Sequence, residues 1–153
     1  MDYIRWIREK VGHEKIILVV AGVIVFDDDG RVLLQKRSKI EELWGFPGGM
    51  MELGESAEET AVREVREETG LEVEITSLLG VYTKYSDQYP NGDKAQPITI
   101  VFKGKAIGGK LKIDGEETHD LQFLHPDQAP KLFNPQSNDI LEDIRQQRTT
   151  VYR

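Results

Sequence analysis

Three glutamates, Glu64, Glu67 and Glu68, stand at positions i, i+3 and i+4 of a run rich in helix-forming residues. On a helix, their carboxylates project from one patch and repel one another unless a cation lies among them. Carboxylate oxygens suit Mg²⁺ or Mn²⁺, which share their remaining coordination positions with substrate phosphates. Arg63 is one position off this patch and four residues from both Glu59 and Glu67, so we expect it to pair with either and help fix a metal ligand. Taken alone, such a charged run is also typical of a solvated helix face.

The residues around this run predict where the helix begins and ends. Ser56 and Glu59 have the spacing of a capping box, in which hydroxyl and carboxylate each bond a backbone N–H at the helix start. Gly70 has the residue type of a left-handed helix end, so we predict a helix over about 56–69. An apolar row beside the carboxylates is expected to dock on a sheet; it consists of Ala57, Ala61 and Val65.

The order of residues from Gly49 to Leu71 resembles the Nudix box of the Nudix hydrolases. It reads as a glycine, five residues, a glutamate, seven residues, an Arg-Glu pair, an aliphatic residue, any residue, a Glu-Glu pair, any residue, a glycine and an aliphatic residue, and no position departs from the pattern. The resemblance implies hydrolysis of a nucleoside diphosphate linked to a group X. It also implies divalent metal held by Glu64, Glu67 and Glu68 and by the backbone carbonyl of Gly48. In several members of the family the counterpart of Glu64 is either the base or a metal ligand, and the box alone does not separate these roles.

A further carboxylate is expected from a loop after the box, as Nudix enzymes often supply one there. Glu116, Glu117 and Asp120 compete for this role, and Glu117 is our choice as an additional metal ligand. His119 is next to it, but a lone histidine in a charged turn is usually just solvated.

Candidate substrate-binding residues flank the box. Arg37 ends a predicted strand just before the loop that leads into the glycines, and we expect its guanidinium to pair with substrate phosphate. A plain surface strand end is the alternative. Phe46 is a core residue or a base-stacking one. Tyr82 belongs to a polar segment, 82–94, that is either a substrate-facing loop with stacking tyrosines or a mobile hairpin tip.

Amides near the C-terminus have two interpretations as well. Asn134, Gln136 and Asn138 lie at the mouth of a predicted helix over about 136–147. They could read a base edge by hydrogen bonds, whereas helix capping is the simpler account.

Composition narrows the class of protein. The chain has 153 residues, 39% of them hydrophobic, and fits one domain over 1–153, with 1–12 as an N-terminal helical extension. That helix, over 2–11, packs on its own domain or makes a homodimer contact through Trp6. The absence of cysteine excludes disulfides, and no apolar run approaches the length of a membrane span, so a cytoplasmic location is the default expectation. A net charge of −7 argues against nucleic-acid binding, whereas bound metal makes a small phosphorylated substrate acceptable.

The order of predicted elements favours an α/β fold in which a mixed sheet lies between helices, an α/β/α sandwich with a short N-terminal helix. The Nudix fold has that architecture. Strands are expected over 16–26, 31–37, 98–106 and 121–124, with one or two strands over 71–82 and a short extended piece over 110–113.

The hypothesis for function is hydrolysis of a phosphoanhydride by in-line attack of water, with metal neutralising the developing charge. Glu64 or a carboxylate of the 116–120 loop takes the proton. A nucleotide-sugar or ADP-ribose substrate is the first choice and a house-cleaning nucleoside triphosphate pyrophosphohydrolase the second; an RNA 5′-end pyrophosphohydrolase is third. A catalytically silent nucleotide-binding module would be expected to lose box glutamates, and none is missing.

Overall fold

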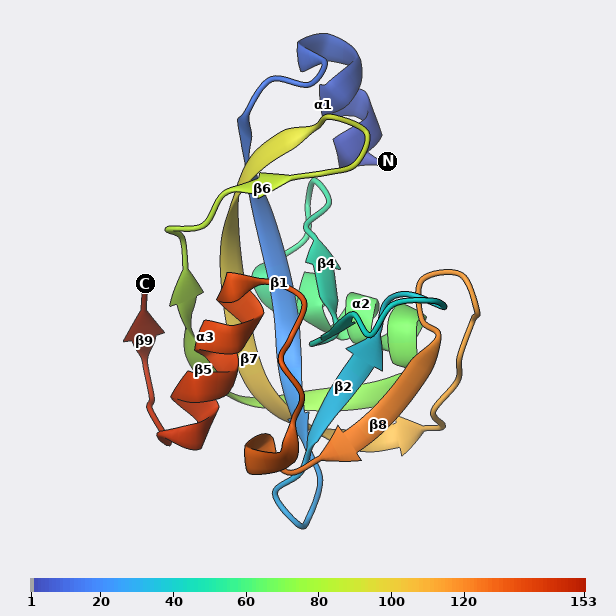
Figure 1. Cartoon of the computed structure of the whole chain (residues 1–153), viewed down its shortest axis with the longest axis vertical. Helices are drawn as coiled ribbons and strands as arrows, with labels where there is room; N and C mark the ends of the chain where they lie inside the picture. Colours follow the sequence, from blue (N-terminus) through green and yellow to red (C-terminus); the bar gives the residue numbers. More distant parts are fainter. Residues whose placement is uncertain (1) are drawn as a thin grey trace.

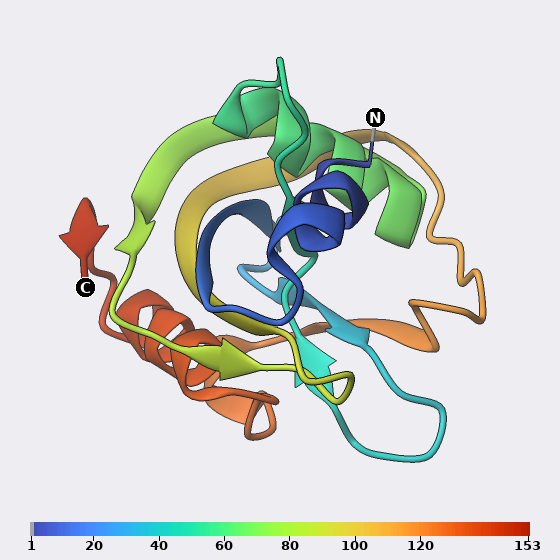
Figure 2. The ribbon, with the colours of Figure 1, turned by 90° about the horizontal axis from the view of Figure 1, so that it is seen from above.

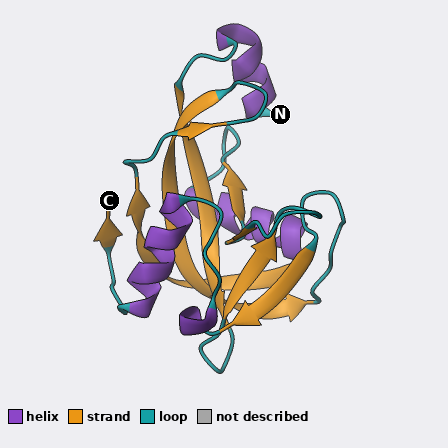
Figure 3. Cartoon of the chain, in the orientation of Figure 1, coloured by secondary structure: helices purple, strands orange, loops and turns teal. Residues whose placement is uncertain are grey.

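A mixed sheet forms the centre of the computed structural model, which describes residues 2–153 (Figures 1 and 3). In chain order the elements are α1 (Tyr3–Val11), β1 (Ile16–Phe26), β2 (Val32–Lys36), β3 (Trp44–Gly45), β4 (Gly48–Met50), α2 (Ala57–Thr69), β5 (Leu71–Tyr82), β6 (Asp87–Gln88), β7 (Lys94–Gly109), β8 (Asp120–Leu124), a 3₁₀ turn (Pro126–Gln128), α3 (Pro135–Arg145) and β9 (Val151–Tyr152). Among the described residues, no helix is both long and apolar enough to cross a membrane.

The strand order is β3-β2-β1-β7-β5-β9, with β4 on β1, β6 on β7 and β8 on β2. β1 runs parallel to β7 over its full length, whereas β5 runs antiparallel to β7. β4 pairs with the middle of β1, where Gly48 lies opposite Gly22. A Cβ on Gly22 would stand 2.6 Å from the carbonyl oxygen of Pro47, so only glycine permits this approach. The box glycines therefore lie against the central strand.

The sheet buries a separate apolar core on each face, because alternate residues of a strand point in opposite directions. On one face, Val23 and Val25 of β1 join Ala61 and Val65 of α2. On the other face, Ile24 packs in a cluster with residues of α3. Figure 2 shows the two helices on opposite sides of the strongly curved sheet.

These observations confirm the predicted α/β/α architecture with a mixed sheet and a short N-terminal helix. The box helix begins and ends as expected: Ser56 and Glu59 form both bonds of a capping box, and Gly70 adopts φ +80°. The extended piece predicted over 110–113 does not form a strand. β7 instead continues to Gly109, and the amide of Lys112 then donates to the carbonyl of Thr69 at the end of α2.

Candidate active site

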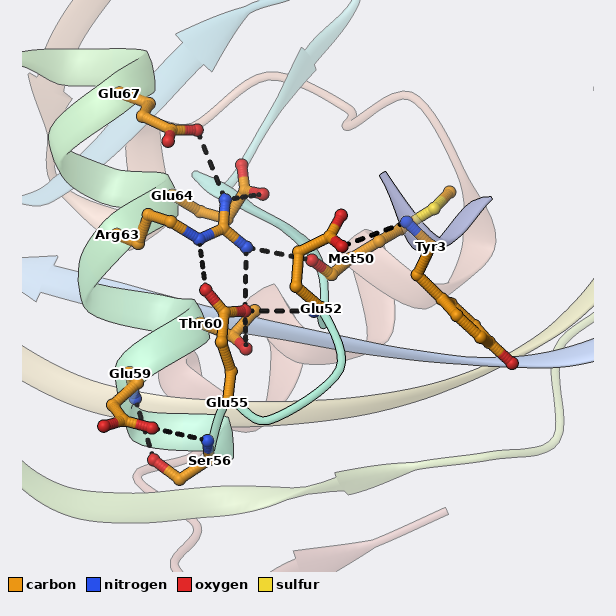
Figure 4. Close-up of polar contacts among 10 residues, drawn as sticks. All are labelled: Tyr3, Met50, Glu52, Glu55, Ser56, Glu59, Thr60, Arg63, Glu64 and Glu67. Atoms are coloured by element: carbon orange, nitrogen blue, oxygen red, sulfur yellow. Dashed lines mark hydrogen bonds and ion pairs between the residues drawn. The ribbon is translucent and has the colours of Figure 1, made fainter. Parts of the chain in front are cut away.

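Arg63 is the centre of a hydrogen-bonded network between α2, β4 and the loop that precedes α2 (Figure 4). Its Nε and Nη2 donate to the two carboxylate oxygens of Glu55, at 2.6 and 3.0 Å. Nη1 donates to Glu64 Oε1 at 2.8 Å and to Glu67 Oε2 at 3.3 Å. Nη2 also reaches the carbonyl of Met50 at 3.1 Å, which ties the helix to β4. The bond to Glu67 confirms one of the two expected pairings of Arg63, whereas the carboxylate of Glu59 accepts from the amide of Ser56 instead.

The pairing with Arg63 favours the ionised form of Glu55. The guanidinium outweighs the cost of partial burial and lowers the pKa of Glu55 from 4.5 to about 2. Glu55 also accepts from the hydroxyl of Thr60 and from the amide of Glu52, so the loop before α2 is bonded to the helix from both sides. Glu55 therefore holds the guanidinium of Arg63, which in turn bonds Glu64.

Glu64 and Glu68 project toward β4. The carboxylate of Glu64 lies against Gly49, where a Cβ would collide with it. Glu68 is only 4% exposed, and its Oε1 accepts weakly from the amide of Gly48 at 3.3 Å. Burial raises the pKa of Glu68 to about 8, and the nearby Glu64 adds to this effect against the opposing charge of Arg37. A nearby cation would favour the charged form of Glu68.

An open cleft joins these carboxylates to other parts of the chain. Its lining contains five carboxylates and a single guanidinium; the residues are Asp2, Ile4, Gln35, Arg37, Gly48, Gly49, Met50, Glu52, Glu64, Glu68 and Glu117. We call this the acidic cleft. Glu117, the predicted additional ligand, lies in it, whereas Glu116 and Asp120 do not line it. Glu67 does not line it either, because its side chain, 58% exposed, leans toward Arg63.

Within the part of the chain that the structure describes, three buried polar atoms of the lining lack a hydrogen-bond partner: Gln35 Oε1, Arg37 Nε and Glu68 Oε2. Gln35 is anchored from behind, since its Nε2 donates to Thr118 Oγ1, which in turn donates to the carbonyl of Glu68. Buried polar atoms are seldom left unpaired. The sequence analysis did not predict Gln35 as a site residue. The available signal was a polar residue two positions after the buried Leu33, on the same face of β2.

The donor set of the acidic cleft fits a hard divalent cation. It offers carboxylate and amide oxygens, two of them buried and unpaired, and Arg63 takes only Oε1 of Glu64 and Oε2 of Glu67. Within residues 2–153, however, no group of three histidine, cysteine, aspartate or glutamate side chains converges closely enough to enclose an ion. The side chains are therefore arranged around Arg63 and not around a metal position.

A second pocket, mainly apolar, opens beside the acidic cleft. The two share Arg37 and the β4 residues 48–50 as a common wall. Aromatic residues of the pocket are Phe46, Tyr89 and Phe133, and its polar residues include Asp87, Thr99, Asn134 and Gln136. We call this the apolar pocket.

The three predicted substrate-binding residues differ in their distance from the two pockets: Arg37 and Phe46 line a pocket, and Tyr82 does not. Arg37 lines both pockets; its Nη2 donates to the carbonyl of Phe46 at 2.6 Å and its guanidinium lies 5.0 Å from the ring of Phe133. Phe46 is largely buried but borders the apolar pocket. Tyr82 lies away from both pockets, fully buried, with its hydroxyl donating to Asp143. It belongs to the core because the alternation of β5 turns it toward α3, and Tyr89 borders the pocket instead.

The amides near α3 divide between the two expected roles. Asn134 caps α3 by accepting from the amide of Ser137, and it also borders the apolar pocket. Asn138 is engaged with the backbone of Leu132. Gln136 faces the pocket, where its Nε2 donates to Thr99 Oγ1 at 2.8 Å.

Comparison with known proteins identifies the class to which this fold and site belong. The chain belongs to the NUDIX domain family, whose model matches residues 17–144. It is a Nudix hydrolase acting on pyrophosphate bonds.

Several relatives and solved structures are similar to the chain. A protein of Bacillus subtilis (strain 168) that carries the provisional name 8-oxo-dGTP diphosphatase is 36% identical, over 82% of this chain and 78% of its own. An ADP-ribose pyrophosphatase of Methanocaldococcus jannaschii is 38% identical over 75% of this chain, which spans only 65% of that protein's length. The crystal structure of a MutT protein from Methanosarcina mazei Go1 has a TM-score of 0.69 and 23% identity over 88% of this chain and 96% of its own, and shows the same fold.

Proposed function

We propose that the protein is a Mg²⁺-dependent pyrophosphohydrolase that cleaves the phosphoanhydride of a nucleoside diphosphate linked to a second group, such as a sugar or ribose. Mn²⁺ is the alternative ion. One observation supports this most strongly: the acidic cleft and the apolar pocket share a wall made by Arg37 and residues 48–50. A molecule with a diphosphate joined to an aromatic or sugar group has the two chemistries that this pair of sites would accept.

The chain's own residues account for binding and orientation. The proposed metal ligands are Glu67 and Glu68, with Glu117 and the carbonyl of Gly48, and Glu64 is assigned to proton transfer. Bound there, the ion would neutralise phosphate charge and lower the pKa of a coordinated water. Arg63 would orient Glu64 and Glu67 through its hydrogen bonds to both. Arg37, with its Nε unpaired, is suited to pair with a phosphate oxygen at the wall between the two sites.

Proton transfer falls to a carboxylate of the cleft. Glu64 and Glu117 both line it and are the two candidates to take the proton of a water attacking phosphorus there. Glu64 is the better placed of the two for a fixed role, because the Arg63 network and Gly49 hold it from two sides. Water activation by Glu64 is therefore the proposed first step, followed by in-line displacement at phosphorus.

The apolar pocket is the proposed site for the base or for the X group. Phe133 is partly exposed at its edge and already lies under the guanidinium of Arg37, so it offers a face for stacking. Gln136 and Asn134 present amide groups to the same pocket. These groups are suited to hydrogen-bond the edge of a base or sugar hydroxyls.

A nucleoside triphosphate pyrophosphohydrolase is the second candidate. The name carried by the Bacillus subtilis relative favours it, whereas the archaeal relative's name favours ADP-ribose. The two reactions differ in product: only the triphosphate enzyme releases pyrophosphate. An 8-oxo-dGTP substrate would use the same acidic cleft and place its purine in the apolar pocket.

The test is a screen of nucleotide sugars, ADP-ribose and nucleoside triphosphates with Mg²⁺ or Mn²⁺, scored by whether nucleoside monophosphate, sugar phosphate or pyrophosphate appears. Glu68→Gln and Glu67→Gln variants should lose most turnover while keeping the wild-type circular dichroism spectrum. Wild-type turnover in both variants would show that the metal roles are assigned wrongly. Tight nucleotide binding without turnover on the whole panel would favour a binding module.

A further inference from the structure

Helix α1 contributes little to either core of the protein. None of its residues is fully buried, and Trp6 is exposed. Figures 1 and 2 show it above one end of the sheet, between the tip of the β6–β7 hairpin and the loop that follows β4. Its apolar residues Ile4, Ile7 and Val11 are half-buried, and its polar contacts reach both of these segments.

The first end of α1 reaches the acidic cleft. The amide of Tyr3 donates to Glu52 Oε2 at 3.0 Å, across 49 residues of sequence (Figure 4). Asp2 and Ile4 themselves line the acidic cleft, together with Glu52. The start of the helix therefore forms part of the wall beside the predicted metal ligands.

The second end of α1 holds the hairpin. The side chain of Arg8 is only 11% exposed; it donates to the carbonyl of Lys94 at 2.7 Å and lies 3.5 Å from Asp93 Oδ2. It also donates to the carbonyls of Gly12 and Glu14, at 3.1 and 2.7 Å. A single guanidinium thus fixes the turn after α1 to the hairpin tip.

The hairpin needs such support, and it borders the apolar pocket. β6 has only two residues, and a ladder this short is marginal by itself. Asp87 and Tyr89, from β6 and the turn after it, line the apolar pocket. Loss of the tether at Arg8 would release the segment that carries both of these side chains.

We propose that α1 is a clasp across the substrate site, and that Arg8 is a positioning residue that keeps Asp87 and Tyr89 against the apolar pocket. The inference rests on the proposed function in one respect, namely that the apolar pocket receives the nucleoside or X group of the substrate. Arg8 touches neither substrate nor metal in this scheme. Its effect passes through the hairpin.

Hydrogen–deuterium exchange on the full chain tests the clasp without any ligand. In Arg8→Ala, amides of residues 86–94 should exchange about tenfold faster, the size expected from losing a charge-assisted hydrogen bond. Arg5→Ala is the matched control, because Arg5 is on the same helix, is 80% exposed and pairs only with Glu9 at 3.6 Å. Exchange in the central strands should stay at the wild-type rate in both variants. Equal exchange of 86–94 in wild type, Arg8→Ala and Arg5→Ala would overturn the proposal.

Ligand binding then tests positioning. The dissociation constant of ADP with Mg²⁺, measured by calorimetry, should rise about tenfold in Arg8→Ala and stay unchanged in Arg5→Ala. On a substrate found by the screen, KM should rise while kcat changes much less, because Asp87 and Tyr89 line the apolar pocket and do not line the acidic cleft. Faster exchange with unchanged ADP affinity would refute the positioning role.

Asp93→Asn tests the same contact from the hairpin side, because Asp93 is the partner of Arg8 there. Asp93 faces Arg8 and also pairs with His13 at 2.6 Å. The variant should speed hydrogen–deuterium exchange in residues 86–94. In the double variant with Arg8→Ala, the change in the free energy of exchange should be smaller than the sum of the changes in the two single variants. Fully additive effects would contradict a shared tether. If the protein neither binds ADP nor hydrolyses any substrate, the proposed function fails, whereas the exchange measurements still decide whether the clasp exists.

Discussion

The carboxylate of Glu64 occupies the space beside the Cα of Gly49 in which a side chain would begin. The two residues are 15 positions apart on different elements, and β4 is held at this distance by its pairing with β1. The position of a predicted metal ligand is thus determined by the absence of a side chain on the neighbouring strand.

Gly49→Ala should therefore displace Glu64 without unfolding the protein. A Cβ at residue 49 would overlap the carboxylate, and a displacement of about 1 Å in an active site can cost about 10²-fold in rate. We expect kcat/KM on the substrate identified by the screen to fall by about this factor. Gly108→Ala is the control, because its Cβ would meet only the Cβ of Glu72, at 3.7 Å, and it should keep wild-type activity. Equal activity of the two variants would show that the position of Glu64 does not limit the reaction.

Arg63→Lys should impair both the site and the helix. Lysine keeps the charge but lacks the planar fork that bonds Glu55 through two atoms while also reaching Glu64 and Glu67. Loss of a group that orients metal ligands typically costs about 10- to 100-fold in activity or metal affinity. Mn²⁺ affinity, measured by electron paramagnetic resonance, and turnover should both fall.

The control for that substitution lies on the same helix. Arg66→Lys changes a residue whose side chain is 55% exposed and pairs with Glu72 at 2.7 Å. It should leave metal affinity and turnover near wild type. A loss as large as that of Arg63→Lys would point to a general effect of charge on α2.

Asp143→Asn should lower stability at neutral pH by about 3 kcal/mol, because it breaks a buried charge pair. Asp143 is fully buried and accepts from Tyr82, Arg148 and Arg153. Burial opposes ionisation, but the hydrogen bonds from Arg153 and Arg148 prevail and lower the pKa of Asp143 from 3.8 to about 2. The free energy of unfolding, measured by urea denaturation, reports the difference.

The pH dependence of that difference follows from the sign of the shift. Because the folded-state pKa is depressed, the stabilisation is present above pH 3.8 and is lost as the pH falls toward 2. The gap between wild type and Asp143→Asn should shrink by about 2 kcal/mol between pH 5 and pH 2. Asp139→Asn, on the same helix but 38% exposed, is the control and should cost much less. A gap that stays constant over this range would show that Asp143 does not ionise as described.

Ser56→Ala should lower the free energy of unfolding by about 1 kcal/mol, because the side chain of Ser56 accepts from the amide of Glu59 at the start of α2. Ser56→Gly should cost only a few tenths of a kcal/mol by the usual ranking of N-cap residues. Thermal unfolding followed by circular dichroism measures both. The prediction is wrong if the glycine variant is as destabilised as the alanine variant.

The sequence by itself determined the family, the box helix and the layered fold. These follow from local rules: the capping box begins α2, Gly70 ends it, and the alternation of strand residues assigns one face of the sheet to each helix. Spacing on a helix also predicted that Arg63 would meet the glutamates. Such features depend on neighbours in sequence, so a linear pattern records them.

Only the tertiary structure decided what surrounds the carboxylates. Gln35, Glu117 and Asp2 come from three distant segments, and the sheet and the position of α1 bring them to one cleft. The same packing moved Tyr82 into the core and placed Tyr89 at the apolar pocket, because β5 presents Tyr82 to α3 while the hairpin carries Tyr89 back over β1 and β7. Contacts between residues so far apart depend on register and strand order, which no local pattern encodes.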